Sequence, residues 1–193
     1  MTIADPYKEL KSLINSTSKN ELECKRYLDF AKELLVKNTP IEFLDVESEY
    51  IGHTGISDYI ISCRSKDDAG IEENYVYIWE LKAPQCFLFE KDSNNRVIPT
   101  KDFISAENQL LHYYNENRES QDFKTNFNIS KSDNVKLGGI IIGSNQTKVK
   151  GGFLDGHKNK LFIKALNIRK EILYGHNGIR VFIWDTILEH LKK

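Results

Sequence analysis

The stretch Ser57-Asp58-Tyr59-Ile60-Ile61-Ser62-Cys63-Arg64 and, after a polar turn, Tyr75-Val76-Tyr77-Ile78-Trp79-Glu80-Leu81-Lys82 decide the fold. Both runs are rich in β-branched and aromatic residues, so the pattern predicts a β-hairpin. Successive side chains of a strand point to opposite faces. Glu80 and Lys82 therefore share one face, while Trp79 and Leu81 share the other.

The hairpin places two carboxylates where a metal site would need them. Asp58 stands at the start of the first strand and Glu80 near the end of the second. Mg²⁺ prefers oxygen ligands and keeps positions for water and substrate phosphate. We expect Asp58 and Glu80 to hold such an ion, and Lys82 to orient or deprotonate a water that attacks a phosphodiester. The alternative is structural, because an acid and a lysine at this spacing also occur on solvent-exposed strands.

A second polar pair lies on a predicted helix that begins near residue 100. Gln109 and Tyr113 stand four residues apart, which places them one turn apart on one helix face. We expect this face to lie near the hairpin.

The remaining chain alternates helices and strands. Residues 20–35 carry apolar side chains at helical spacing, and Ser18 with Glu21 forms the pattern of a capping box. Residues 115–135 are polar and indicate a long connection. The apolar run at 135–143 predicts a buried strand, and 155–174 a basic amphipathic helix whose core side would include Leu161, Ala165, Ile168 and Ile172. A final strand leads into a helix with Asp185 as its cap.

This order predicts an α/β fold with a central mixed β-sheet flanked by helices. The 193 residues suit a single domain with its core over about 20–190. The sequence has no apolar run long enough to cross a bilayer and no signal-peptide pattern, so no membrane role is expected. Three irregularly spaced cysteines favour a reducing cytoplasm over a disulfide framework or a zinc site.

Charge is distributed unevenly along the chain. Residues 136–170 carry a local charge of +7 within a chain whose net charge is −1. A basic segment beside a carboxylate site suits a protein that binds the phosphate backbone of DNA. The expected nucleic-acid contacts are Lys148, Lys150, Lys158 and Lys160. The alternative is a solvated helix face.

Asp58, Glu80-Leu81-Lys82 and Gln109-x-x-x-Tyr113 together resemble the PD-(D/E)XK, or restriction-endonuclease-like, nuclease superfamily. Over about residues 20–190 the chain resembles the nuclease domain of the Shedu anti-phage defence family. The resemblance also covers the following stretches: Asn20-Glu21-Leu22-Glu23-x-x-x-Tyr27-Leu28, Trp79-Glu80-Leu81-Lys82-Ala83-Pro84, Gly139-Ile140-Ile141-Ile142-Gly143 and Val181-Phe182-Ile183-Trp184-Asp185.

The resemblance implies a restriction-endonuclease-like core and a cytoplasmic endonuclease that cuts or nicks DNA with Mg²⁺ or Mn²⁺. It implies that Asp58, Glu80 and the Leu81 carbonyl hold the metal and that Lys82 serves the water. Gln109 and Tyr113 would brace the site. The superfamily's first helix often supplies a glutamate near the metal, and Glu21 is the candidate.

Two other functions remain open. One is a module on a nuclease scaffold that binds nucleic acid or a partner without cleaving. The other is an exonuclease or RNase of the same fold. A lone catalytic domain that makes a double-strand break needs two copies, so a homo-oligomer is expected.

Overall fold

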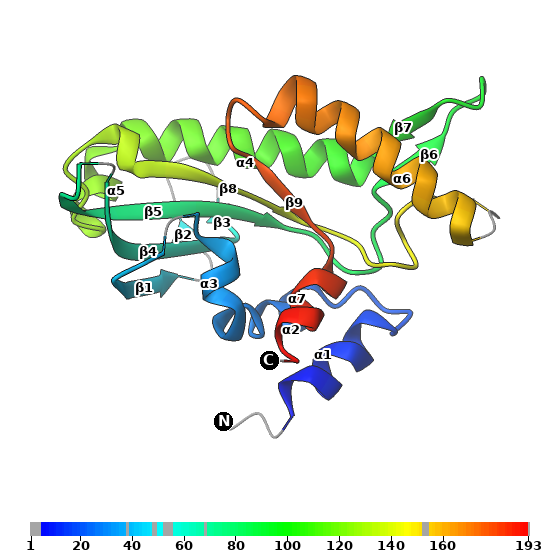
Figure 1. The fold of residues 1–193 in the computed structure, drawn as a ribbon, viewed down its shortest axis with the longest axis horizontal. Helices are drawn as coiled ribbons and strands as arrows, with labels where there is room; N and C mark the ends of the chain where they lie inside the picture. Colours follow the sequence, from blue (N-terminus) through cyan, green and yellow to red (C-terminus); the bar gives the residue numbers. More distant parts are fainter. Residues whose placement is uncertain are drawn as a thin grey trace.

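The computed structural model describes residues 5–37, 39–47, 50–51, 56–67, 69–151 and 155–192. Its centre is a five-stranded mixed sheet with the order β1-β4-β5-β8-β9, covered by helices on both faces (Figure 1). The α/β class and the central mixed sheet are therefore confirmed. The strands are β1 (Glu42–Glu47), β4 (Tyr59–Lys66), β5 (Glu72–Leu81), β8 (Val135–Ile141) and β9 (Arg180–Phe182).

The predicted hairpin forms the middle of this sheet. Strands β4 and β5 pair antiparallel from Lys66 opposite Glu72 to Tyr59 opposite Trp79. Strand β8 pairs parallel to β5, with a register shift between Ile78 and Trp79. At that shift Gly138 lies against the Trp79 indole, where a Cβ would approach Trp79 Nε1 to 2.3 Å. Only glycine lets the main chain of β8 come this close to the indole. The bulge beside Trp79 therefore depends on glycine at position 138.

One face of the sheet packs against α4 (Lys101–Glu119) and α6 (Asp155–Arg169). Helix α4 begins as predicted, with Thr100 as an N-cap that accepts the Phe103 N–H at 3.3 Å. The buried side chains on this face include Ile60, Val76, Ile78 and Ile140 from the sheet, and Phe103, Ala106 and Leu110 from α4.

The other face packs against α1 (Pro6–Ile14), α2 (Glu21–Lys25), α3 (Lys32–Leu35) and α7 (Trp184–His190). The alternation of β4 and β5 supplies this second core from the intervening positions. Its buried members include Tyr59, Ile61, Tyr77, Trp79, Leu81, Leu28, Leu35, Trp184 and Ile187.

The predicted single helix over 20–35 is wrong. Helix α2 ends at Lys25, and a 3₁₀ segment, η1 (Leu28–Ala31), separates it from α3. Its apolar positions are buried as expected, including Cys24 and Tyr27. The capping box is also wrong, because α2 begins directly at Glu21 and Asn20 is its N-cap. Packing against α1 and α7 has overridden the continuous helical pattern.

The connection over 115–135 is more ordered than predicted. It contains the end of α4, helix α5 (Gln121–Asn126) and η2 (Ser132–Asn134). Three isolated apolar residues anchor it, since Phe123, Phe127 and Ile129 are all buried. Between β5 and α4, residues 85–100 contain a hairpin of β6 (Phe89–Lys91) and β7 (Val97–Pro99). The hairpin projects from the body beside α6 (Figure 1).

Helix α6 differs from its prediction in the side that it buries. It continues as a π-helix, η3 (Lys170–Tyr174). Leu161 and Ala165 pack on the core as expected, but Ile168 and Ile172 are 48% and 69% exposed. Leu166 and Tyr174 are buried in their place. The π turn shifts the register of the helix face from Lys170 onward, which accounts for Tyr174 but not for Leu166.

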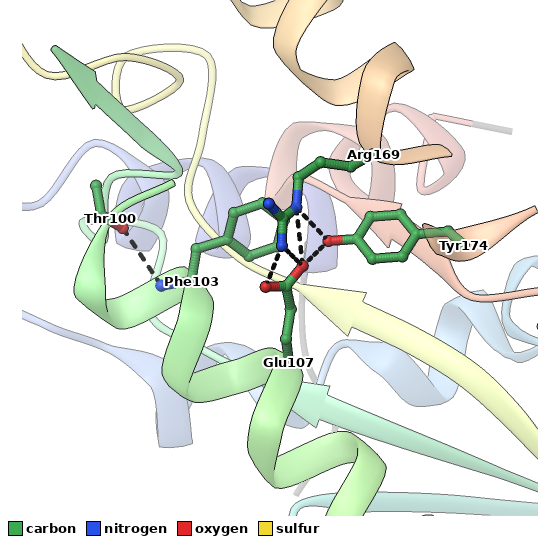
Figure 2. A network of polar contacts seen from close by, with 5 residues as sticks. All are labelled: Thr100, Phe103, Glu107, Arg169 and Tyr174. Carbon is green, nitrogen blue, oxygen red and sulfur yellow. Dashed lines mark hydrogen bonds and ion pairs between the residues drawn. The ribbon is translucent and has the colours of Figure 1, made fainter. Parts of the chain in front are cut away.

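A polar network fastens this segment to α4. Arg169 and Tyr174 both donate hydrogen bonds to the Glu107 carboxylate of α4, and the Arg169 guanidinium lies over the Phe103 ring (Figure 2). The Arg169 and Glu107 side chains are only 19% and 12% exposed. Because both charged groups are largely buried, their hydrogen-bonding groups find partners only when the helices are arranged in this way. The ion pair therefore fixes α6 against α4.

Two smaller elements complete the chain. Strands β2 (Tyr50–Ile51) and β3 (Ile56–Ser57) form a separate two-stranded sheet just before Asp58. Within the described ranges, no helix is long and apolar enough to cross a membrane.

Candidate active site

The site lies where β4 begins and β5 ends. Tyr59 pairs with Trp79, so continuing the antiparallel register by one residue places Asp58 opposite Glu80. Cross-strand neighbours point to the same face. That face is the α4 side, since Ile60 and Ile78, two residues from Asp58 and Glu80, belong to the α4-side core. The two carboxylates of the sequence prediction thus share one surface.

Glu80 is the most deeply buried charged group of this site. Its side chain is 2% exposed, whereas that of Lys82 is 19% exposed, and Lys82 Nζ donates to Glu80 Oε1 at 2.6 Å. The other oxygen, Glu80 Oε2, is buried and accepts no hydrogen bond from an N–H donor among the described residues. Glu80 also interacts with the Asp58 side chain through a hydrogen bond, which requires a proton on one of the two carboxyl groups. Two carboxyl groups this close favour a cation that both can bind.

The electrostatics of the three groups are coupled. Burial, and then the neighbouring Asp58 carboxylate, raise the pKa of Glu80 to about 8, against the opposing effect of Lys82. Burial, the largest single effect, would lower the pKa of Lys82, but the charge and hydrogen bond of Glu80 together with the charges of Asp58 and Glu21 outweigh it, and the net pKa is raised. Lys82 is therefore an ammonium in this state. Groups perturbed by both burial and specific charges are typical of functional sites.

The main chain around Lys82 is held from several directions. Asp58 Oδ2 accepts the Leu81 N–H at 2.9 Å, and Ile141 O accepts the Lys82 N–H at 2.8 Å. The indole Nε1 of Trp184 donates to the Lys82 carbonyl at 2.8 Å. The Leu81 side chain is buried on the opposite face, so only its main chain faces the site.

Glu21 reaches the same site from the other side of the strand end. Its carboxylate lies near the Ala83 N–H, which favours the ionised form, and it interacts electrostatically with Lys82 and Asp58. Burial raises the pKa of Glu21, and the nearby Lys82 opposes that rise. The structure therefore brings together Glu21, Asp58, Glu80 and Lys82, four of the six predicted catalytic residues.

Gln109 and Tyr113 lie on α4, the helix that covers this face of the sheet. Both are half-buried, and Tyr113 packs against the α4-side core. Gln109 accepts a long hydrogen bond, 3.5 Å, from Ser105 Oγ one turn earlier on α4. Their predicted role in bracing the site stays a prediction.

The predicted nucleic-acid contacts gather where the loop 144–151 meets the start of α6. Lys148 Nζ donates to Asn159 Oδ1 at 2.9 Å and lies over the Phe162 ring, and burial lowers the pKa of Lys148. Lys158 donates to the Gln146 carbonyl. Lys150 Nζ lies 3.8 Å from Glu90 Oε2, and the Lys160 side chain is exposed. Two of the four lysines therefore hold the loop on the helix.

The donor set suits an open metal site better than an enclosed one. Among the residues that the structure describes, no group of three or more His, Cys, Asp and Glu side chains could enclose a metal ion. Two carboxylates are nevertheless sufficient for Mg²⁺, which retains several waters and binds substrate phosphate. The neighbouring carboxyl groups of Asp58 and Glu80 fit this kind of ligand set.

The sequence did not point to the residues that support the site. Trp184 belongs to a stretch of the noted resemblance, but nothing in the pattern assigned it to the Lys82 carbonyl. Asp185 is not the predicted cap of α7, since it accepts from the Asn145 main chain and side chain at 2.7 Å. Thr147 Oγ1 donates to the Pro84 carbonyl at 2.8 Å. These are contacts between distant parts of the chain, which local patterns do not encode.

Comparison of the chain with protein-family models, with curated proteins and with solved structures found no match.

Proposed function

We propose that this protein is a metal-dependent nuclease that hydrolyses phosphodiester bonds in DNA. The observation that carries the proposal is the pair of neighbouring carboxyl groups, Asp58 and the buried Glu80, beside Lys82 at the end of a central strand. Glu80 Oε2 accepts no hydrogen bond from an N–H donor among the described residues, and a bound cation would neutralise two acids that otherwise have to share a proton.

The topology supports the same proposal. The antiparallel pair β4–β5 carries the carboxylates, and α4 lies between β5 and its parallel neighbour β8 in the chain order. This is the arrangement expected of a restriction-endonuclease-like core, and the resemblance to Shedu nuclease domains extends the proposal to anti-phage defence in the cytoplasm.

Asp58, Glu80 and the Leu81 carbonyl would hold Mg²⁺ or Mn²⁺. When bound, such an ion polarises the phosphate and acidifies the attacking water. Lys82 Nζ would orient that water toward phosphorus or, once Glu80 and Asp58 are engaged by the ion, take up its proton. Glu21 would stay near the Ala83 main chain beside Lys82. Gln109 and Tyr113 brace the scissile strand from α4, and the lysines at the loop 144–151 and on α6 contact the backbone.

The test is cleavage of supercoiled plasmid with Mg²⁺, with Mn²⁺ and with EDTA. Glu80→Ala and Lys82→Ala should abolish metal-dependent nicking or linearisation. Glu73→Gln is a matched control, because Glu73 is a glutamate on the same strand that pairs with a lysine, Lys131, at the opposite end. Cleavage that persists in Glu80→Ala would overturn the proposed site.

The same experiment separates the related functions. An exonuclease would spare closed plasmid and degrade linear DNA, and an RNase would cleave only RNA. Absence of cleavage with retained DNA binding would favour a non-cleaving module. We also propose a homo-oligomer for double-strand cleavage, which the mass of the DNA-bound protein in light scattering would test.

A further inference from the structure

Gln85 lies in the turn that follows the site, three residues after Lys82, and its side chain contacts the N-terminal segment. Gln85 Oε1 accepts the Asn20 N–H at 3.3 Å. Gln85 Nε2 donates to the Leu13 and Ser16 carbonyls, at 3.0 Å each. One amide thus uses its acceptor and both donors on a segment that is 65 to 72 residues away in the chain.

These bonds hold both ends of the linker between α1 and α2. Leu13 belongs to the last turn of α1, and Asn20 is the N-cap of α2. The Asn20 Nδ2 also donates to the Leu13 carbonyl, at 3.2 Å, which closes the linker on itself. Gln85 therefore sets where α2 begins relative to the end of β5.

The first residue of α2 is Glu21. Its carboxylate lies near the Ala83 N–H and interacts electrostatically with Lys82 and Asp58. The Gln85 bond to Asn20, the residue before Glu21, therefore attaches the start of α2 to the segment 82–85 beside this contact. Loss of the Gln85 bonds would leave only the Glu21 contact, on a helix of five residues.

The far side of this segment is also fixed. Gly143 N donates to the Ala83 carbonyl at 3.2 Å, and Thr147 Oγ1 donates to the Pro84 carbonyl at 2.8 Å. Residues 83–85 are thus a rigid base on the β8 side. The Gln85 side chain extends from residues 83–85 to the linker between α1 and α2. Its hydrogen bonds therefore fix the position of α2 relative to residues 83–85.

We propose that Gln85 is a positioning residue for Glu21: its amide holds the linker 15–20 so that the Glu21 carboxylate stays on the Ala83 N–H beside Lys82. Gln146 offers a matched control. Its Nε2 donates to Asn15 Oδ1 at 2.9 Å, so it ties the same linker to the loop 144–151 from an exposed position and without contacting Asn20.

The first experiment measures hydrogen exchange at the Ala83 amide by NMR, with no metal or DNA present. Gln85→Met and Glu21→Gln should each accelerate exchange about ten-fold or more, the value expected when a buried hydrogen bond opens. The double variant should be no faster than the faster single one, and Gln146→Met should match the parent protein.

Three results would overturn the proposal. Exchange could be unchanged in Gln85→Met while it rises in Glu21→Gln; it could be unchanged in both; or it could rise equally in Gln85→Met and Gln146→Met, which would indicate general loosening. If Gln85→Met does not fold, Gln85→Glu serves, because it keeps the acceptor for Asn20 N–H and loses both donors. It should then give an intermediate acceleration.

The second experiment rests on the proposed function. In plasmid cleavage, Gln85→Met should lower kcat in the parent background and have no further effect in a Glu21→Gln background, while Gln146→Met leaves kcat unchanged. An equal kcat loss from Gln85→Met in both backgrounds would overturn the link to Glu21. Absence of cleavage by the parent protein would instead count against the nuclease function and leave the exchange experiment to decide on Gln85.

Discussion

The indole Nε1 of Trp184 donates a hydrogen bond to the main-chain carbonyl of Lys82 at 2.8 Å, although 102 residues separate the two in the chain. Trp184 is fully buried at the start of α7. The last helix of the protein thus fixes the backbone of the residue that we propose to orient the attacking water. Stability and activity should therefore be linked at this contact.

Trp184→Phe tests that link. The variant leaves the buried Lys82 carbonyl without its donor, which should lower the free energy of unfolding by about 1 to 3 kcal/mol. It should also lower kcat of cleavage, because Lys82 loses its fixed position. Chemical denaturation and plasmid cleavage per folded molecule would measure the two effects.

Trp79→Phe is the control for this substitution. Trp79 is the other tryptophan of the chain, and its Nε1 donates to the Leu35 carbonyl at 3.0 Å on the face away from Glu80. The two variants should lose similar stability, but only Trp184→Phe should lose activity. Equal losses of kcat in both would mean that Trp184 acts through stability alone.

The raised pKa of Glu80 predicts how stability depends on pH without metal. In the unfolded chain a glutamate loses its proton near pH 4.3, whereas in the folded protein the Glu80 pKa is about 8. Between these values the folded state binds one more proton, so its stability falls as pH rises. Glu80→Gln removes the titrating group and with it this pH dependence. The difference in free energy of unfolding between Glu80→Gln and the parent protein should therefore shift in favour of the variant from pH 5 to pH 8, by at most a few kcal/mol, and then level off. A pH-independent difference would contradict the assignment.

Metal binding should oppose this loss. An ion that binds only the folded state stabilises it by about 2.7 kcal/mol at a hundred-fold excess over its Kd. For a chain of this size that corresponds to a rise in Tm of about 5 to 10 °C. Mn²⁺ should produce the shift in the parent protein, and EDTA should reverse it. Asp58→Asn and Glu80→Gln should show little or no shift. A shift retained in both variants would place the ion elsewhere.

The network of Figure 2 predicts a stability effect that is separate from the site. Arg169→Met would leave the Glu107 carboxylate, which is 12% exposed, with the Tyr174 hydroxyl as its remaining donor in this network, and should cost about 3 kcal/mol. Tyr174→Phe should cost less, because Arg169 still pairs with Glu107. Arg118→Met is the control, since the Arg118–Asp133 pair is exposed and such pairs contribute about 1 kcal/mol or less. Urea denaturation at neutral pH would rank the three, and equal losses would contradict the role of burial.

Local patterns predicted the parts of the fold that depend on local physics. The alternation of β4 and β5 fixes which side chains share a face, so the placement of Glu80 and Lys82 on one surface follows from sequence alone. The length of the turn then places Asp58 opposite Glu80. The N-cap of α4 at Thr100 was predictable for the same reason, because capping involves residues only three apart.

The remainder depends on tertiary contacts that no local pattern encodes. The continuous stripe over 20–35 is buried, but the chain breaks into α2, η1 and α3 to follow the curved surface of the sheet and α1. Gln85 is a single glutamine in a turn, and the sequence gives it no special role. Its hydrogen bonds to the linker form only because the fold brings the end of α1 beside its side chain. Two of the predicted lysines, Lys148 and Lys158, also make contacts between the loop 144–151 and α6, which their charge alone did not indicate.

That last difference gives a prediction for DNA binding. Lys150 and Lys160 extend from the surface, whereas Lys148 is held against Asn159 and the Phe162 ring. If the surface binds the phosphate backbone, each exposed lysine that contacts a phosphate adds about 0.9 to the slope of log K against log salt concentration. Lys150→Ala and Lys160→Ala should each reduce that slope by about 1 and weaken binding at low salt. Lys148→Ala should change the slope less.

Titration of a labelled duplex at several salt concentrations, with Glu80→Gln protein and EDTA to prevent cleavage, would measure these slopes. Slopes unchanged in both exposed variants would remove this surface from the DNA path.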